Sequence, residues 1–382
     1  MKKAKITILI LFVGTLAAFF LIPLIKPQKD FSDIENRALE QHPDIDLEDL
    51  LSGDYQKSYE NYLNDQFIAR DRWVDLAVDY EKLLGKKDVN GIYLGKDGYL
   101  LEKYSDGDFQ KLQVENNIAI LSEFINRMSD TYGKEHVDCL MVPGKAAALP
   151  QKLPAYAKPF DEQEIITQIA DNLEHPEELL DLTEVMHTHE DEYIYYRTDH
   201  HWTTLGAYYA YEAWCQKKNQ EPLSQEDFEI EEVADDFYGT SYNKSHQKVK
   251  PDSIMFFHGK AEQKVHVNWN DGEQESDSWY KRSDLNGNDK YRAFFDGNTA
   301  KITVQTGTEN KKTLLLLKDS YANCFVPFLA GYYNKIVMID LRYNPDLIDD
   351  IIADCGDITD VMILYNVEKF LQDEHVDLLA EN

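Results

Sequence analysis

The chain has 382 residues, 43% of them hydrophobic, which is enough for one large domain or two smaller ones. Its 39 Lys and Arg against 70 Asp and Glu give a formal net charge of -31. Such an acidic surface repels nucleic acid and anionic lipid headgroups, so no nucleic-acid partner is expected, and the charge suits solubility or a neutral or cationic partner.

The N-terminus carries the features of an export segment. Three lysines among the first five residues precede a run from Ile6 to Ile25 that contains no charge. About 20 apolar residues suffice for a helix to cross a bilayer, and flanking lysines favour the cytoplasmic side. We therefore expect residues 1–26 to be a membrane anchor or uncleaved signal, with the N-terminus in the cytoplasm and the body of the protein outside it. A cleaved signal peptide, and hence a secreted protein, is the alternative.

The remaining chain is expected to form a linker and one domain. Residues 27–50 are polar and acidic and indicate a juxtamembrane linker, and residues 51–382 indicate a single α/β domain. Residues 221–300 are irregular and rich in Asp, Asn, Gly and aromatics, so we expect an insertion of loops and strand pairs over the site. The four cysteines form no Cys-x-x-Cys pair, which leaves no zinc-knuckle or thioredoxin spacing, and no disulfide is required.

The final third of the chain alternates apolar runs with segments of helical pattern. The runs cover residues 314–317, 335–341 and 360–366. Runs that are apolar throughout are typical of parallel strands buried on both faces. The pattern predicts β-α-β-α-β-α with a parallel sheet, in which ligands gather at the carboxyl ends of the strands.

Ser320 lies where that rule places a functional group. It follows the apolar run Leu314 to Leu317 and opens the next helical segment. Its hydroxyl would then lie near backbone N–H groups that can stabilise an oxyanion. A simple helix cap is the alternative interpretation, because Ser and Asp are common before helices.

The stretch YYRTDHHWTTLGA, residues 195–207, supplies the partners that a serine nucleophile needs. In an extended segment residues i and i+2 point the same way, so Asp199 and His201 approach the same space while His200 faces away. A nucleophilic serine requires a base to take its proton and a carboxylate to orient that base. The triad would be Asp199, His201 and Ser320; a pair of partly buried structural histidines is the alternative.

A metal site is a further interpretation of the same cluster. His187 and His189 alternate as ligands on a strand do, and they could join Asp199, His200 and His201 around zinc or iron. The histidines lack the HExxH spacing or another specific one. The triad interpretation is therefore preferred, and no cofactor or metal is expected.

Several stretches resemble one protein family. RTDHHWT resembles the signature of the DHHW family of exported bacterial proteins, a family similar to the SGNH-hydrolase-like domain of the alginate O-acetylation enzymes. Further stretches fit its pattern: FSDIENRAL (31–39), DQFIARDRW (65–73), NGIYLGKDGYL (90–100), LKDSYANCFVPFL (317–329) and IDLRY (339–343). The resemblance extends over nearly all of the chain after the apolar N-terminal run, from the first of these stretches to the last.

The resemblance implies an SGNH-hydrolase-like, three-layer α/β/α fold with a parallel sheet and a permuted motif order, because the serine comes last. In the alginate enzymes an Asp-x-His pair and a later serine form the triad, and those positions fall on Asp199, His201 and Ser320. The resemblance also implies an O-acetyltransferase that modifies hydroxyls of an envelope or secreted polysaccharide, with a membrane-bound O-acyltransferase as acetyl donor. If water accepts the acyl group instead, the same machinery is an esterase. A non-catalytic polysaccharide-binding or assembly protein is the third possibility, since fold alone does not establish activity.

The chain departs from the usual SGNH pattern in the turn before the serine. The usual turn is Gly-Asp-Ser, whereas this chain has Lys318, Asp319 and Ser320. The asparagine of the third SGNH block has no single match, so three residues are candidates for the oxyanion site: Asn298, Asn323 and Asn366.

Three further side chains are candidates for the substrate pocket. Arg342 follows the apolar run 335–341 and could bind a carboxylate or a sugar oxygen; an ion pair with Asp340 is the alternative. Tyr343 and Tyr365 could line the pocket, although tyrosine is more often plain packing.

Overall fold

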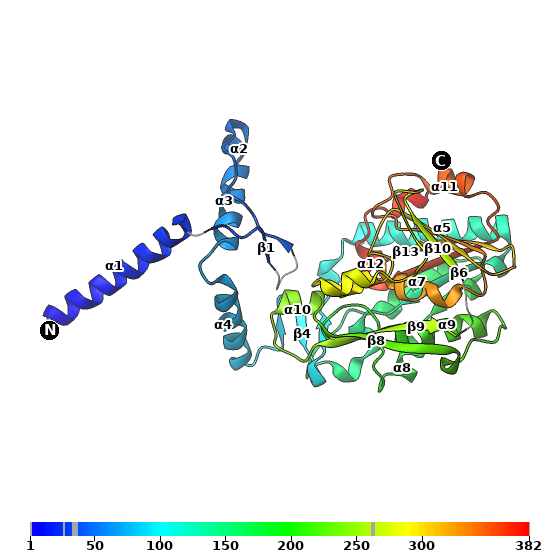
Figure 1. The fold of residues 1–382 in the computed structure, drawn as a ribbon, viewed down its shortest axis with the longest axis horizontal. Coiled ribbons are helices and arrows are strands. Elements are labelled where there is room, and N and C mark those ends of the chain that lie inside the picture. The colour runs from blue at the N-terminus through cyan, green and yellow to red at the C-terminus, as the bar shows by residue number, and fades with distance from the viewer. Residues whose placement is uncertain (1, 26, 33–36, 261–263, 382) are drawn as a thin grey trace. The chain divides into compact units, whose positions relative to one another are not determined.

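The computed structural model describes residues 2–25, 27–32, 37–260 and 264–381 (Figure 1). The chain divides into two compact units. The first comprises Met1–Lys86 and Asn243–Lys248, and the second comprises Lys87–Tyr242 and Val249–Asn382. The division of the chain into a linker and a domain from residue 51 stays a prediction.

The first unit is mostly helical. Its helices are α1 (Lys2–Ile25), α2 (Leu47–Ser52), α3 (Asp54–Asp65) and α4 (Arg70–Leu83), and strands β1 (Phe31–Ser32) and β2 (Arg37–Ala38) form an antiparallel pair. The Arg37 guanidinium donates to both carboxylate oxygens of Asp65, at 2.6 and 2.8 Å, and so ties β2 to the end of α3. Residues 27–50, expected as a linker, thus contribute strands to this unit.

The apolar N-terminal run expected as a membrane anchor forms most of α1. None of the helices in the described ranges combines the length and the apolar character needed to span a membrane.

The second unit is built on an eight-stranded sheet in the order β11-β10-β12-β14-β13-β15-β6-β7. Five neighbouring strands, β14, β13, β15, β6 and β7, are parallel. The apolar runs of the final third form three of them, as predicted. The bounds are β6 Val137–Val142, β7 Leu179–Asp181, β10 Val265–Trp269, β11 Gln274–Ser276, β12 Lys301–Thr306, β13 Thr313–Lys318, β14 Lys335–Ile339 and β15 Asp360–Asn366.

The expectation of a wholly parallel sheet is wrong: the sheet is mixed. β10, β11 and β12 join it in antiparallel pairings. β10 and β11 are connected by a tight turn in which Asn270, Asp271 and Gly272 have positive φ. A turn this short can join only antiparallel neighbours, because a parallel pair needs a long crossover. Part of the expected insertion 221–300 therefore extends the main sheet.

Helices cover both faces of this sheet (Figure 1). Leu315 and Leu317 of β13 pack toward α5 (Lys111–Tyr132), α7 (Glu162–Asn172), α11 (Ile348–Cys355) and α12 (Val367–Gln372). Leu314 and Leu316 pack toward α6 (Lys145–Ala148), α8 (Thr183–Thr188) and α9 (Thr204–Lys217). Because alternate residues face opposite layers, a strand buried on both sides has to be apolar throughout. The three-layer α/β/α arrangement is as expected.

Two small sheets complete the second unit. β3 (Asp88–Val89), β4 (Ile92–Leu94) and β5 (Leu100–Glu102) are antiparallel. β8 (Phe228–Phe237) and β9 (Asp252–Gly259) form a long antiparallel pair on the α9 face, and α10 (Thr240–Ser245) starts between them.

Candidate active site

Ser320 lies at the carboxyl end of β13, inside the parallel part of the sheet. It opens a 3-10 turn, Ser320–Cys324, that Asp319 caps by accepting a hydrogen bond from the Tyr321 N–H at 2.9 Å. The second carboxylate oxygen of Asp319 accepts from the Asn366 N–H at 2.9 Å, which joins the ends of β13 and β15. Both bonds fix the backbone that carries the serine hydroxyl.

His201 lies between Asp199 and Ser320. Its Nδ1 is 2.5 Å from Asp199 Oδ1, and its Nε2 is 2.7 Å from Ser320 Oγ. A carboxylate only accepts hydrogen bonds, so Nδ1 carries the ring proton and the lone pair of Nε2 faces the serine hydroxyl. The three residues are 2%, 5% and 7% exposed, so little water competes for these bonds.

The Asp199 carboxylate is held by more than His201. It accepts from the His201 backbone N–H at 3.0 Å, from the Thr240 N–H at 2.9 Å and from the Thr240 hydroxyl at 3.1 Å. Gly239 leaves room for it, since a Cβ there would lie 2.2 Å from the Cβ of Asp199. Burial would raise the pKa of Asp199, but the two neighbouring imidazoles and their hydrogen bonds lower it well below its usual range.

Burial, with His200 alongside, lowers the pKa of His201 to about 4. The imidazole is therefore neutral near neutral pH and free to accept a proton. Its ring stacks on Tyr291 at 3.8 Å between centroids and 10° between planes. The Tyr291 hydroxyl donates to the carbonyl oxygen of Ser320 at 3.0 Å, so one tyrosine supports both the base and the serine.

Two hydrogen bonds clasp the histidine segment to the serine turn. The Trp202 indole N–H donates to the Tyr321 carbonyl at 2.9 Å, and the Tyr321 hydroxyl donates to the His200 carbonyl at 2.6 Å. Asp252 of β9 fixes the same segment from the other side by accepting from the Thr198 N–H and hydroxyl, at 2.7 and 2.5 Å. The distance between His201 and Ser320 is thus set by a rigid frame.

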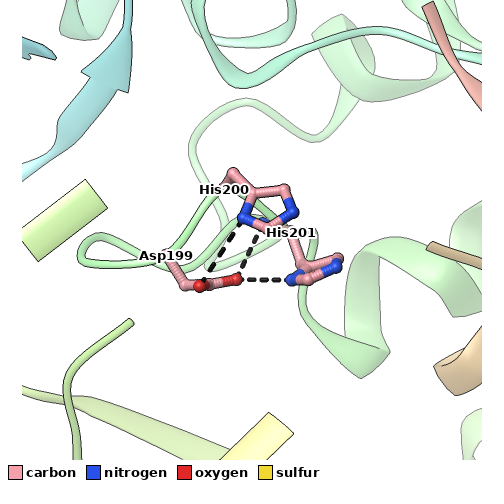
Figure 2. A group of neighbouring side chains, drawn as sticks. All are labelled: Asp199, His200 and His201. Atoms are coloured by element: carbon pink, nitrogen blue, oxygen red, sulfur yellow. Dashed lines mark hydrogen bonds and ion pairs between the residues drawn. The ribbon is translucent and has the colours of Figure 1, made fainter. Parts of the chain in front are cut away.

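His200 lies beside His201, whereas the alternation of an extended strand predicts that it would face away. Residues 197–201 form a bend, and the ring of His200 lies 3.8 Å from that of His201. Its Nδ1 is 2.6 Å from the Thr240 hydroxyl and 3.7 Å from Asp199 Oδ2. Figure 2 shows both imidazoles approaching the Asp199 carboxylate.

The ligand atoms of Asp199, His200 and His201 all lie within 4.8 Å of one another, as a metal site would require. The other two candidate ligands lie elsewhere: His187 Nε2 bonds the Ala147 carbonyl at 2.9 Å, and His189 pairs with Glu192 at 2.8 Å. Zinc ordinarily takes three or four protein ligands. The cluster offers three residues, but two of them, His201 and Asp199, are already hydrogen-bonded to each other through Nδ1 of His201. The arrangement fits a hydrogen-bonded triad better than a metal centre.

Two of the candidate asparagines surround a buried cation. Lys318 is fully buried, and its Nζ donates to Asn298 Oδ1 at 3.1 Å and to Asn323 Oδ1 at 3.0 Å. The same ammonium lies 3.4 Å from Asp340 Oδ2. Burial lowers the pKa of Lys318. Lys318, which stands where SGNH proteins have glycine, thus organises the residues beneath the serine turn.

Arg342 forms the ion pair that was the alternative to substrate binding. Its Nε and Nη2 donate to the two oxygens of Asp340 at 2.8 and 2.6 Å. Its side chain is 28% exposed, so part of it still reaches solvent.

The remaining candidates lie in structural positions or on the surface. Asn366 caps α12, accepting from the Lys369 N–H, and its amide donates to the Val142 carbonyl at 3.1 Å. Tyr365 is buried, with its hydroxyl 3.4 Å from Asp373 Oδ2, whereas Tyr343 is 54% exposed. Their assignment to the pocket stays a prediction.

Sequence patterns did not single out four residues that hold the triad: Thr240, Asp252, Tyr291 and Lys145. Lys145 alone had a usable signal, since it follows Pro143 and Gly144 at the end of an apolar run. The other three lie in the irregular region 221–300, where no periodicity marks them.

The second compact unit is an α/β domain with a mixed central sheet. Near the carboxyl ends of its parallel strands, an aspartate is hydrogen-bonded to a histidine and that histidine to a serine. Residues 166–339, a stretch that includes all three, match the family model described as DHHW protein. The resemblance to the DHHW family is thereby confirmed. No curated protein matches the chain.

Solved structures share the fold. A DHHW family protein from Eubacterium siraeum has a TM-score of 0.60 at 24% identity, over 76% of this chain and 95% of that one. PatB1 of Bacillus cereus has a TM-score of 0.60 at 19% identity, over 76% of this chain and 99% of that one. The same protein with a sulfonyl adduct has a TM-score of 0.58 at 20% identity, over 74% and 95%. The O-acetyltransferase domain of Pseudomonas putida AlgJ is more distant, at 15% identity and a TM-score of 0.44, over 74% and 93%.

Proposed function

We propose that this protein is an acyltransferase that moves an acetyl group onto a polysaccharide hydroxyl through an acyl-serine at Ser320. The observation that carries the proposal is the position of His201, with one ring nitrogen 2.7 Å from the serine hydroxyl and the other 2.5 Å from the Asp199 carboxylate. A weak nucleophile becomes active when a base within hydrogen-bond reach is itself oriented by a third group.

The first half-reaction forms the acyl-serine. Ser320 Oγ attacks the carbonyl carbon of the acyl donor, and its proton passes to His201 Nε2. Asp199 stabilises the imidazolium that forms and keeps the ring oriented. The tetrahedral intermediate then collapses, the bond to the leaving group breaks, and the leaving group takes the proton from His201.

The second half-reaction transfers the acyl group. A sugar hydroxyl loses its proton to His201 and attacks the ester carbon, and Ser320 leaves and recovers that proton. A water molecule in place of the sugar would make the protein an esterase, so the outcome depends on how well the bound glycan excludes water. The neutral resting state of His201 suits a general base in both steps.

The choice of an acetyl group and a polysaccharide rests on the resemblance of the RTDHHWT stretch to DHHW proteins and, through them, to the alginate O-acetylation enzymes. A membrane-bound O-acyltransferase is the proposed acetyl donor. Lysines followed by an apolar run are typical of export signals, so we place the reaction outside the cytoplasm. Fractionation of cells that produce the full chain tests this location, and recovery in the cytoplasmic fraction would contradict it.

The test of the chemistry uses the purified full chain with a chromogenic acetyl ester, with and without oligosaccharide acceptors. Ser320→Ala and His201→Ala should abolish turnover, whereas Ser122→Ala, which alters another buried serine on α5, should not. Acetylated oligosaccharide in the products supports the transferase, and acetate alone supports the esterase. Glycan binding without turnover of any ester would leave a non-catalytic binding protein, and loss of turnover with a chelator would favour the metal interpretation.

A further inference from the structure

Lys145 is a buried lysine that takes no part in the proton transfers above. It opens α6 at the carboxyl end of β6 and is 1% exposed. Its Nζ donates to the carbonyl of Tyr196 at 2.8 Å and to that of Asp199 at 2.5 Å, and lies 3.4 Å from the carbonyl of Arg197. An ammonium has three protons, so this one side chain can supply a donor to each of three carbonyls within residues 196–199.

The bend that Lys145 fills is the one that presents Asp199 and His201. Its ends are closed by a bond from the Tyr196 N–H to the His201 carbonyl at 3.2 Å and by the pairing of Tyr195 with Trp202. Closure at the ends leaves the carbonyls inside the turn pointing inward, and buried carbonyls without a donor are costly. The ammonium supplies that donor at the residue whose carboxylate must meet the imidazole.

Acidic groups lie on the elements around Lys145 and favour its charged form. Glu102 of β5, Asp252 of β9, Asp199 of the bend and Glu368 of α12 all act on it electrostatically. Burial lowers the pKa of Lys145 to about 8, and the four acidic groups oppose that fall. An apolar side chain would avoid the cost of burying a charge, so the packing of α6 alone does not account for an amine here.

We propose that Lys145 is a positioning residue for the acyl-transfer reaction, which fixes the bend so that the Asp199 carboxylate meets Nδ1 of His201. The inference rests on the proposed function for the reaction itself. Its geometric part, the alignment of Asp199 with His201, does not depend on which acyl group is transferred. Misplacing a catalytic group by about 1 Å can cost about a hundredfold in rate, so a loosened bend has a measurable effect.

The test replaces the amine with a side chain of similar length in the full chain. Lys145→Met should lower kcat for an acetyl ester by at least about tenfold with KM within about twofold, because the base and not the binding surface is disturbed. The low-field proton resonance of the bond between His201 and Asp199 should shift or vanish. Lys335→Met is the matched control, because Lys335 of β14 also donates to a backbone carbonyl, that of Cys355 at 3.2 Å. It should leave kcat and the resonance unchanged.

A folded Lys145→Met variant with the wild-type kcat and resonance would overturn the inference. If that variant does not fold, Lys145→Arg keeps the charge but not the compact three-proton donor. A folded Arg variant that loses the resonance supports positioning, one that keeps it contradicts positioning, and failure of both variants to fold would mark Lys145 as purely structural.

Failure of the proposed function is distinguishable from failure of this inference. If the wild-type chain turns over no ester and Ser320 is not labelled by a sulfonyl fluoride, the acyl-serine mechanism is wrong. The resonance still decides whether Lys145 aligns Asp199 with His201, since it needs no turnover. A wild-type chain that shows neither turnover nor the resonance overturns both.

Discussion

His201 Nε2 lies 2.7 Å from Ser320 Oγ although 119 positions separate the two residues in the chain. The histidine comes from the bend before α9, and the serine follows the parallel strand β13. The indole of Trp202 bridges the same two segments by donating to the Tyr321 carbonyl at 2.9 Å. Since both segments are tied to the same frame, their approach is a property of the fold and does not need a bound substrate.

Asp199→Asn should lower kcat by about a hundredfold to ten-thousandfold with little change in KM. An amide that bonds His201 favours the wrong tautomer, and the imidazole then loses the lone pair that faces the serine. Steady-state kinetics with a chromogenic ester measures the loss. Asp373→Asn is the control, since Asp373 is a buried carboxylate that bonds His375 and Tyr365 instead. An Asp199→Asn variant with the wild-type kcat would show that Asp199 has no role in catalysis.

The rate should depend on pH through His201. Only the neutral imidazole can take the serine proton, so kcat/KM for the free protein should be constant above its pKa of about 4 and fall tenfold per pH unit below it. A pH–rate profile measures this limb. A limb centred on the ordinary value of 6.5 would mean that the burial of His201 is not maintained in solution.

The free energy of unfolding should decrease as the pH is lowered, because of the same histidine. Its pKa is lower in the folded chain than the ordinary value of 6.5, so the unfolded chain binds the extra proton first. The stabilisation is present above pH 6.5 and is lost as the pH falls from 6.5 to about 4. Urea unfolding at several pH values measures it, and His201→Gln should flatten the dependence in this window. An equal dependence in the variant would assign the effect to other groups.

Arg342→Met should destabilise the protein by about 3 kcal/mol, because it leaves the fully buried Asp340 with Lys318 as its remaining cation. Urea unfolding at neutral pH measures the change, and the double variant with Asp340→Asn should recover part of it. The same variant tests the substrate role that the sequence suggested. A raised KM for the acceptor in the folded variant would assign Arg342 to the pocket, and an unchanged KM would leave it as the partner of Asp340.

Tyr291→Phe should keep the ring stacked on His201 and remove the hydrogen bonds that its hydroxyl donates to the Ser320 carbonyl and, at 3.4 Å, to Cys324 Sγ. The expected cost is about 1 kcal/mol of stability, measured by thermal unfolding, since one buried carbonyl loses its donor. Tyr291→Leu also removes the stacked ring, so its kcat should fall further than that of the Phe variant. Equal kcat values for the two variants would show that the stacked ring does not support the base.

The sequence predicted strands at 314–317, 335–341 and 360–366, and it predicted that functional residues lie at the carboxyl ends of parallel strands. Runs such as Leu314 to Leu317 are apolar at every position, a pattern typical of strands that are buried on both faces of a sheet. The antiparallel strands β10 and β11 were not placed in the sheet, because strand order depends on pairings that no local pattern encodes. His200 was misjudged because the i, i+2 rule applies to extended segments and residues 197–201 are bent.

The sequence by itself was enough to name the members of the candidate triad, because a serine after an apolar run and an Asp-x-His pair are local patterns and the stretch RTDHHWT resembles DHHW proteins. Only the tertiary structure decided that these side chains meet, that Arg342 is bonded to Asp340, and that Lys145 lies beneath the Asp199 bend. The physical reason is the distance along the chain over which each kind of interaction acts. Periodicity and capping act within a few residues, whereas hydrogen bonds between distant segments depend on how sheet and helices pack, and that packing sums many contacts that no short stretch contains.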